Sequence, residues 1–437
     1  MSVRSLLLGV CGSALLSAAT VPPQTTFYKG VLPVIQNRCQ ECHRPGEAAP
    51  MPFVTYKDVR PWAKAIREAV ITRKMPPWPA DPHFGKFSND RSLSREEIDT
   101  LVAWADGGAL EGDPAEAPKP ARFVDGWGIH KPDAIFEMPN EFNVPASGTV
   151  DYQYIVIPSG FTEDKWVQEA EARPGNRRLV HHIIAFIRPP GSEWLKEAQP
   201  GVPFVRVKKE NREKRKHRQD DDAAPPELLV GFAPGMPPAI LRPGQAKLVK
   251  AGSDFVFQMH YTANGKPGTD RSRIGIVFAK EPPRERVYTV AAQNDKFEIP
   301  AGAANYEVES DITLQEPAKL VNMMPHMHLR GKDFEYTAFY PSGESEVLLR
   351  VPKYDFSWQL YYYPAEQKVL PAGTRLHCVA HFDNSPNNPA NPDATQAVRW
   401  GDQSWEEMMI GFFDVAMVPG KDPMDLFQEK KPGKRGD

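Results

Sequence analysis

Residues 181–187, with the sequence HHIIAFI, place two histidines at the start of a short apolar run. Runs of four to eight apolar and β-branched residues between turn-forming residues are typical of buried strands. Similar stretches follow along the chain, separated by turns rich in glycine, proline and asparagine: Tyr152–Ile157, Phe255–Tyr261, Phe334–Tyr340, Leu376–Phe382 and Met408–Val415. This spacing predicts antiparallel β-sandwiches for most of the chain.

Five histidines lie on or beside these predicted strands: His181, His182, His260, His326 and His328. Residues i and i+2 of a strand share a face, so the two histidines of H-x-H could bind one ion. The adjacent pair points to opposite faces of a regular strand, and could bind one ion only if the backbone bulges there. A lone buried histidine is usually just hydrogen-bonded, but this combination favours a metal. Imidazole suits zinc, copper, iron or nickel, and an added thioether would favour copper.

The segment Cys39-Gln40-Glu41-Cys42-His43 is a C-x-x-C-H sequence, the attachment pattern of c-type haem. The two thiols would bond to the porphyrin, and His43 would be the proximal iron ligand. A thioredoxin-like redox pair or half of a zinc site is the alternative. Neither a βαβ pattern nor a second C-x-x-C accompanies the motif, so haem is the favoured interpretation.

The opposite face of the iron needs a second ligand. Met75, in the sequence KMPPW, is the expected ligand, because a thioether raises the haem potential and the prolines fix an extended loop. Met51, eight residues after His43, is its rival. Helices are predicted over Tyr56–Arg73 and from Ser94, where Ser94 and Glu97 form a capping box, to the stop at Gly107-Gly108. Residues 25–112 resemble small class I cytochromes c.

Bulk composition bounds the remaining possibilities. A chain of 437 residues suggests two or three domains, and 41% hydrophobic with 25% charged residues is ordinary for a globular protein. The net charge of -3 gives a nucleic-acid partner no electrostatic support. Residues 1–19 are interpreted as an export signal, with a lipoprotein signal at Cys11 as the alternative, and no membrane span is predicted after its cleavage. Cys378 is expected to be a buried, inert thiol.

In the C-terminal region, the histidine motifs occur in a recognisable order. HH is followed by Gln258-Met259-His260-Tyr261, then by H-x-H with Leu-x-Gly, then by Glu-Met on a late strand. Over about residues 125–418 this order resembles the copper type II, ascorbate-dependent monooxygenases, which include peptidylglycine α-hydroxylating monooxygenase and dopamine β-monooxygenase. The resemblance implies two jelly-roll-like β domains, each holding one copper, that face each other across a cleft.

The resemblance also implies ligands and an activity. His181, His182 and His260 correspond to the ligands of the electron-transfer copper, and His326, His328 and Met408 to those of the copper that activates oxygen. Met409 is the alternative to Met408. The implied reaction is hydroxylation of a C–H bond by O2. A covalently held haem could pass electrons to the first copper, since fusion raises its effective concentration there. The original electron donor would be an ascorbate-like reductant or a redox protein.

Two departures from that family limit the analogy. The chain offers no disulfide network, whereas the animal enzymes are rich in disulfides. Met324, Ile410 and Phe412 stand where the peptidylglycine enzyme has polar groups that bind a peptide carboxylate. We therefore expect a rather apolar substrate. Two alternatives stay open: a non-catalytic periplasmic protein that binds copper or transfers electrons, and a cytochrome fused to a β-sandwich binding module whose histidines are structural.

These observations predict a multi-domain protein with a small all-α domain followed by two all-β sandwich domains, located in the periplasm or otherwise exported. The expected boundaries are listed by residue number: signal 1–19, cytochrome c domain 25–112, linker 113–124, first β domain 125–285, second β domain 286–418 and polar tail 419–437. Residues 208–222, almost entirely charged, are expected to form a solvated loop in the first β domain.

Overall fold

The computed structural model describes residues 24–47, 49–123, 126–206, 227–421 and 426–427. The predicted export signal, the charged loop 208–222 and most of the polar tail lie outside the described residues. Within the described ranges, no helix is both long enough and apolar enough to cross a membrane.

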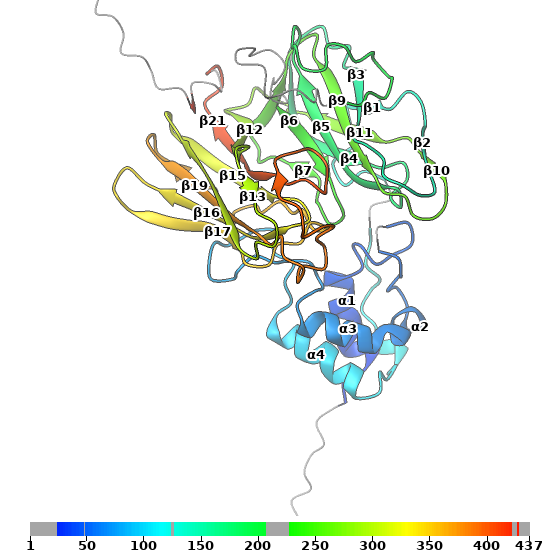
Figure 1. The fold of residues 1–437 in the computed structure, drawn as a ribbon. Helices are drawn as coiled ribbons and strands as arrows, with labels where there is room; N and C mark the ends of the chain where they lie inside the picture. Colours follow the sequence, from blue (N-terminus) through cyan, green and yellow to red (C-terminus); the bar gives the residue numbers. More distant parts are fainter. Residues whose placement is uncertain (1–23, 48, 124–125, 207–226, 422–425, 428–437) are drawn as a thin grey trace, which may run out of the picture.

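A small helical part precedes the strands and lies beneath them in Figure 1. Its elements are a π-helical turn η1 (Phe27–Val31), α1 (Leu32–Arg38), α2 (Tyr56–Val59), a 3-10 turn η2 (Arg60–Trp62), α3 (Ala63–Ile71), α4 (Arg95–Asp106) and a 3-10 turn η3 (Pro114–Glu116). Its core is formed by the apolar faces of these helices and contains the fully buried Phe27, Leu101 and Trp104.

The helix boundaries follow from local sequence. The Ser94 hydroxyl accepts from Glu97 N, and the Glu97 carboxylate accepts from Ser94 N, so the predicted capping box of α4 is confirmed, as is its end before Gly107. The helix predicted over residues 56–73 is divided by the turn η2, which contains Pro61, because proline has no N–H to donate within a helix. Trp62, at the end of this turn, is 39% exposed.

The rest of the described chain consists mainly of strands. They are β1 (Ala134–Glu137), β2 (Phe142–Val144), β3 (Gln153–Pro158), β4 (Lys165–Arg173), β5 (Val180–Arg188), β6 (Leu228–Phe232), β7 (Ala239–Ile240), β8 (Gln245–Val249), β9 (Asp254–Tyr261), β10 (Gly268–Asp270), β11 (Arg273–Phe278), β12 (Glu285–Asn294), β13 (Glu298–Ile299), β14 (Tyr306–Thr313), β15 (Ala318–His326), β16 (Gly331–Phe339), β17 (Ser345–Val351), β18 (Val369–Leu370), β19 (Arg375–Phe382), β20 (Val398–Arg399) and β21 (Met409–Met417). Each stretch predicted as a strand is found within three residues of its expected bounds.

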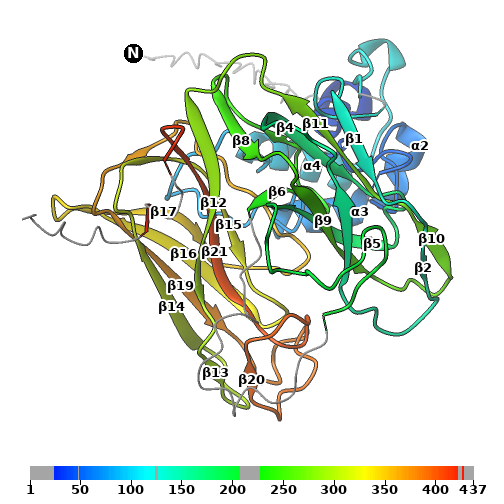
Figure 2. The ribbon, with the colours of Figure 1, turned by 90° about the horizontal axis from the view of Figure 1, so that it is seen from above.

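The strands form two sandwiches that share one sheet. The shared sheet has the order β1-β11-β4-β8-β12-β21-β15-β18, with β7 beside β4. The sheet β3-β9-β5-β6 packs on its first half and β14-β19-β16-β17 on its second, and each sandwich encloses its own apolar core. Figure 2 shows the sandwiches side by side. The β-sandwich prediction is confirmed at this level.

The junction within the shared sheet is narrow. Strands β8 and β12 pair in parallel through Gln245↔Glu285 and Ala246↔Arg286. Beside this pairing the buried Lys247 ammonium donates to the Leu228 carbonyl at 2.6 Å and to the Thr289 hydroxyl at 2.8 Å. A short pairing and one buried polar network therefore join the two sandwiches at this point.

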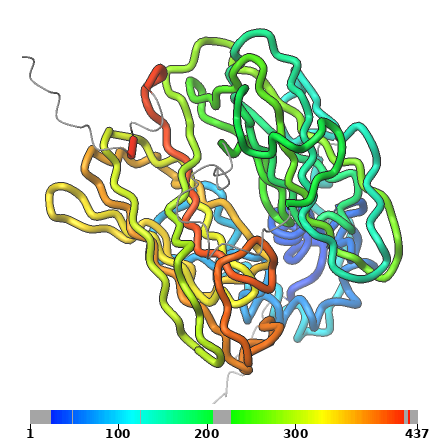
Figure 3. Tube along the Cα trace, turned by 45° about the horizontal axis from the view of Figure 1, so that its top comes forward, coloured from blue at the N-terminus to red at the C-terminus, as the bar shows by residue number. Residues whose placement is uncertain are grey.

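The helical part also contacts the second sandwich directly, through the segment between α3 and α4. Ala80 belongs to that sandwich's core, and Trp78 and Phe87 pack against it. Ser88 N donates to the Tyr363 carbonyl and Ala365 N to the Lys86 carbonyl, both at 2.8 Å. The tube in Figure 3 shows the blue helical part against both β regions. The module is therefore docked through residues 78–91 as well as connected through the predicted linker.

Candidate metal centres

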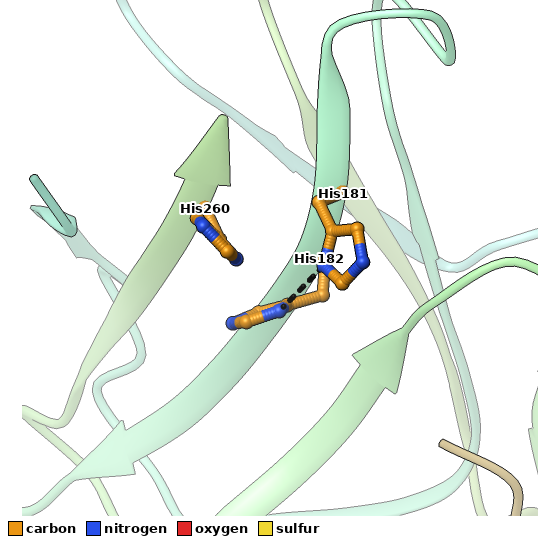
Figure 4. Close-up of side chains that lie close together, drawn as sticks. All are labelled: His181, His182 and His260. Carbon is orange, nitrogen blue, oxygen red and sulfur yellow. Dashed lines mark hydrogen bonds between the residues drawn. The ribbon is translucent and has the colours of Figure 1, made fainter. Parts of the chain in front are cut away.

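His181, His182 and His260 converge on the face of sheet β3-β9-β5-β6 that points away from its core. One ring nitrogen of each lies within 4.8 Å of the others, the one such group of histidine, cysteine and acidic ligands among the described residues. His182 pairs directly with His260 across β5 and β9, and the register shifts between Val180 and His182. That irregularity is the bulge that the sequence required for adjacent histidines to share a site. Figure 4 shows the three rings turned toward one another.

The opposite face of the same strands is apolar, and this fixes the direction of the histidines. Ile183 on β5 with Met259 and Tyr261 on β9 belong to the core of the first sandwich. Because side chains alternate along a strand, His182 and His260 point out of that core. Tyr152 closes one side of the group, with its ring edge-on to His182 at 5.5 Å and to His260 at 4.8 Å between centroids.

The ring nitrogens of this group are poorly satisfied by protein. His260 Nδ1 is buried and has no hydrogen-bond partner among the described residues. His181 Nδ1 and His182 Nδ1 are 3.4 Å apart, so at most one of them can donate to the other. Burial lowers the pKa of His260 to about 3 and that of His182 well below its usual value, so these rings are neutral at pH 7. Neutral imidazoles with unshared lone pairs are what a transition-metal ion requires.

His326 and His328 form a second group at the end of β15. Met327, between them, is 0% exposed in the core of the second sandwich, so both histidines point to the opposite face, where they are 8% and 1% exposed. Their ring centroids are 5.2 Å apart at 88°. The structure therefore places the H-x-H pair on one face, as the i, i+2 spacing predicts.

Both rings of this pair have their tautomer fixed through Nδ1. His328 Nδ1 lies 3.1 Å from the Glu406 carbonyl, and His326 Nδ1 lies 2.8 Å from Gln359 Oε1. A carbonyl oxygen can only accept, so Nδ1 is the proton donor in each of these two contacts; the Gln403 carbonyl also hydrogen-bonds the His328 ring. This arrangement, a ring N–H held by a carbonyl, is typical of metal-binding histidines.

The two candidate methionines, Met408 and Met409, are adjacent at the start of β21 and point to opposite faces. Met409 is 0% exposed and packs in the core of the second sandwich with Phe413. Met408 precedes it, half-buried, and alternation places Met408 on the face of Ile410, whose register partner on β15 is His326. Met408 therefore shares the face of the histidine pair, and Met409 points away from it.

The wall beside this pair is apolar. Met324 and Phe412 are register partners on the face of His326, and the rings of Phe412 and His326 are 6.1 Å apart. Ile410 and Met324 are buried. The residues that replace the polar groups of the peptidylglycine enzyme thus lie together along β15 and β21, beside His326.

Glu407, whose role sequence reasoning missed, holds the H-x-H loop against β21. Its buried carboxylate accepts from His328 N at 2.9 Å and from Arg330 N at 2.7 Å. Burial raises the pKa of Glu407 to about 8, and these backbone donors oppose that rise. The Arg330 guanidinium donates to Asn384 Oδ1 and to the Trp405 carbonyl, both at 2.8 Å. The residue that precedes Met408 is thus hydrogen-bonded to the backbone of His328.

A loop residue contacts both groups of histidines. The ring of Phe356 stacks on His181, with centroids 5.4 Å apart at 18°, and meets His328 edge-on at 5.8 Å and 82°. The electrostatic influence of His326 and His328 reaches His182 and further lowers its pKa. The two groups therefore lie near each other, on the facing sides of the two sandwiches, with Phe356 in contact with both.

In the C-x-x-C-H segment, the His43 ring is held by one hydrogen bond and one stacking contact. His43 Nδ1 lies 3.1 Å from the Met51 carbonyl, which leaves Nε2 as the free ring nitrogen. Phe53 stacks on the face of the same ring at 4.3 Å and 1°, so the Nε2 edge is not covered by it. Burial raises the pKa of Cys39 to about 12 and also raises that of Cys42, which is unlike a reactive thiol pair. Cys378 is likewise fully buried, as expected.

The two candidates for the second iron ligand are placed differently. The Met51 carbonyl receives the His43 ring N–H, and Met51 packs against the helical core. Met75 follows the end of α3 and its N donates to the Ala69 carbonyl at 3.2 Å. Since Met51 lies on the His43 side, Met75 stays the better prediction for the opposite face.

Comparison with known proteins assigns the chain to no family. No family model matches the chain, and no curated protein matches it. Among solved structures, the infectious bursal disease virus VP2 subviral particle is 10% identical, covers 68% of this chain and 74% of its own, and has a TM-score of 0.20. The Macrobrachium rosenbergii nodavirus is 13% identical over 71% of this chain and 97% of its own, with a TM-score of 0.15. Scores this low carry no argument about fold or function.

Proposed function

We propose that this chain is an exported copper-dependent monooxygenase that hydroxylates a C–H bond with O2 and receives electrons through a covalently bound haem. One observation carries the proposal. His181, His182 and His260 converge with a buried ring nitrogen that has no partner among the described residues, and they lie near a second histidine pair whose Nδ1 atoms face carbonyl oxygens.

The donor sets favour copper over other metals. The first group offers three neutral imidazoles, and the second offers two imidazoles with the thioether of Met408 on the same strand face. A thioether is a soft ligand that favours Cu(I). Bound there, copper would supply one-electron reduction of O2. The chain's own residues fix the tautomers through Gln359 and the Glu406 carbonyl, and present the apolar wall of Met324, Ile410 and Phe412 to a substrate.

The residues around the C-x-x-C-H segment fit a haem. Cys39 and Cys42 would hold the porphyrin covalently, and His43 would ligate the iron through Nε2, with Met75 as the expected opposite ligand. The His43 N–H held by the Met51 carbonyl supports this assignment. A small cytochrome c domain followed by two copper-binding, jelly-roll-like β domains is the finer architecture that we infer.

Metal and oxygen measurements test this function. Protein matured with haem and loaded with copper should contain one haem and two copper ions per chain. Oxygen uptake should depend on substrate, and product analysis with a panel of hydrophobic compounds should show a hydroxylated product. Haem without copper would contradict the proposal and favour a binding module. Two copper ions without substrate-coupled oxygen uptake would favour a non-catalytic electron-transfer protein.

A further inference from the structure

We propose that Phe356 is a positioning residue that fixes the separation of the two histidine groups, so that two bound ions are held at one constant distance. This inference rests on the proposed function, because it assigns a role within the two-copper site. It concerns a loop residue outside both groups of candidate ligands.

Phe356 belongs to a segment that we call the strap, residues 354–365, between β17 and β18. The strap is anchored to the second sandwich on both sides of Phe356. The Tyr354 hydroxyl accepts from Met327 N at 3.1 Å and donates to the Met327 carbonyl at 2.8 Å. Gln359 bonds to His326. The strap therefore holds the H-x-H segment from two sides, and the ring of Phe356 is fixed relative to it.

From this anchored position the ring reaches the other sandwich. The ring stacks on His181, within 18° of parallel, and makes a T-shaped contact with His328. Aromatic rings packed this way gain about 0.5–1.5 kcal/mol beyond burial of their area. Because β8 and β12 join the sandwiches through a short pairing elsewhere in the shared sheet, the contact of Phe356 with His181 constrains their spacing at the site itself.

The far end of the strap is bonded to the helical part. Asn89 Nδ2 donates to the Tyr361 carbonyl at 2.7 Å, and Tyr363 N donates to Asn89 Oδ1 at 3.1 Å. One continuous segment thus contacts both histidine groups and the module that carries C-x-x-C-H. We infer that it sets the geometry of all three together.

The test compares Phe356→Ala with Phe356→Tyr, which keeps the ring, in the full chain. In copper-loaded protein, the dipolar interaction between the two Cu(II) ions is measured by EPR. A single narrow interaction is expected for the wild type and for Phe356→Tyr, and a broadened one for Phe356→Ala with unchanged copper content. If Phe356→Ala does not fold, Phe356→Leu replaces it, since leucine keeps apolar volume without a flat ring.

A second measurement needs no copper. Nitroxide labels at Lys266→Cys on the first sandwich and Ser342→Cys on the second report the distance distribution, with the chain lacking both added cysteines as background. Removal of the ring should widen this distribution, which loss of stability alone would not do in folded protein. An unchanged distribution and an unchanged copper interaction would overturn the role of Phe356. A widened distribution in a chain that binds fewer than two copper ions would instead refute the proposed function and leave the positioning role intact.

Discussion

At the scale of single residues, the hydrogen bonds of the imidazoles separate candidate ligands from ordinary histidines. His43, His326 and His328 each give the Nδ1–H to a carbonyl oxygen. By contrast, both ring nitrogens of His377 on the outer face of β19 face carboxylates, with Nδ1 2.9 Å from Asp311 and Nε2 4.0 Å from Glu309. His260 has a buried nitrogen without a hydrogen-bond partner in the part of the chain that the structure describes, which is a cost in the metal-free chain.

This cost gives a prediction that distinguishes a ligand from a structural histidine. His260→Leu removes the unpartnered nitrogen, so the metal-free variant should match or exceed the wild type in stability, by up to about 1–3 kcal/mol. The copper content should fall from two ions to one, and the rise of Tm on adding copper should shrink. Denaturant unfolding and metal analysis measure both effects. His377→Leu is the control and should leave copper content unchanged, whereas a strongly destabilised metal-free His260→Leu would mean a structural histidine.

The carboxylate of Glu227, which belongs to neither histidine group, should make the stability of the chain depend on pH. Its carboxylate Oε2 accepts from Arg286 at 3.0 Å, but Oε1 is buried without a partner among the described residues. Burial raises the pKa of Glu227 to about 7, from 4.5. A raised carboxyl pKa contributes stability below the unfolded value that is lost as pH rises through the folded value.

The unfolding free energy of the metal-free wild type, relative to Glu227→Gln, should therefore fall between about pH 4.5 and pH 7. A shift of this size corresponds to about 3 kcal/mol. Denaturant midpoints of both proteins across that range provide the measurement. Parallel pH profiles for the two proteins would show that Glu227 titrates normally in the folded chain.

At the scale of elements, alternation along strands explains what could be predicted from sequence. The H-x-H spacing places His326 and His328 on one face because the residue between them enters the core. For the HH pair, periodicity predicted that both histidines could bind one ion only if the strand bulges there. The register shift before His182 is that bulge. Phe356, Gln359 and Glu407 could not be predicted, because their roles depend on contacts between loops and strands far apart in sequence, which no local period encodes.

Alternation on β21 also predicts opposite results for adjacent methionines. Met408→Leu should lose the copper of the H-x-H site, and with it substrate hydroxylation, while the free energy of unfolding changes little at this half-buried position. Met409→Leu should keep both copper ions and cost less than about 1.5 kcal/mol, as conservative core replacements do. Copper analysis of the two variants decides between them. Loss of copper in Met409→Leu alone would reverse the assignment.

At the scale of the whole molecule, the helical part is held against the sandwiches near the segment that would carry the haem. Glu47, just after the C-x-x-C-H sequence, forms a 3.1 Å ion pair with Arg177, in the loop before His181. Within the helical part, the Glu41 carboxylate of the motif lies 3.6 Å from the guanidinium of Arg91, at the end of the segment 78–91 that docks on the second sandwich. This docking could not be read from sequence, since the predicted linker alone suggested a tethered module.

The Glu47–Arg177 pair connects the candidate haem segment to the loop that leads into the first histidine group, so it should support electron transfer between them. Both side chains are about one-fifth exposed, at 19% and 22%, and a pair of this kind contributes about 1 kcal/mol or less. Arg177→Glu should slow the reoxidation of reduced haem by oxygen in copper-loaded protein, measured by stopped flow. The double variant Arg177→Glu with Glu47→Arg should recover part of the rate. The effect should weaken at high salt, which screens partly exposed charges.

Arg67→Glu provides the matched control, because Arg67 pairs with Asp106 inside the helical part at 2.8 Å. It makes the same change of charge, but on the helical part and in a pair that involves neither Glu47 nor Arg177, so haem reoxidation should keep the wild-type rate. If Arg67→Glu and Arg177→Glu slow the reaction equally, net charge rather than docking controls the rate. If neither does, while copper and haem contents are normal, electrons enter the first histidine group without help from this contact. A rate that falls in Arg177→Glu and recovers in the charge exchange would identify the pair as the coupling between the two modules.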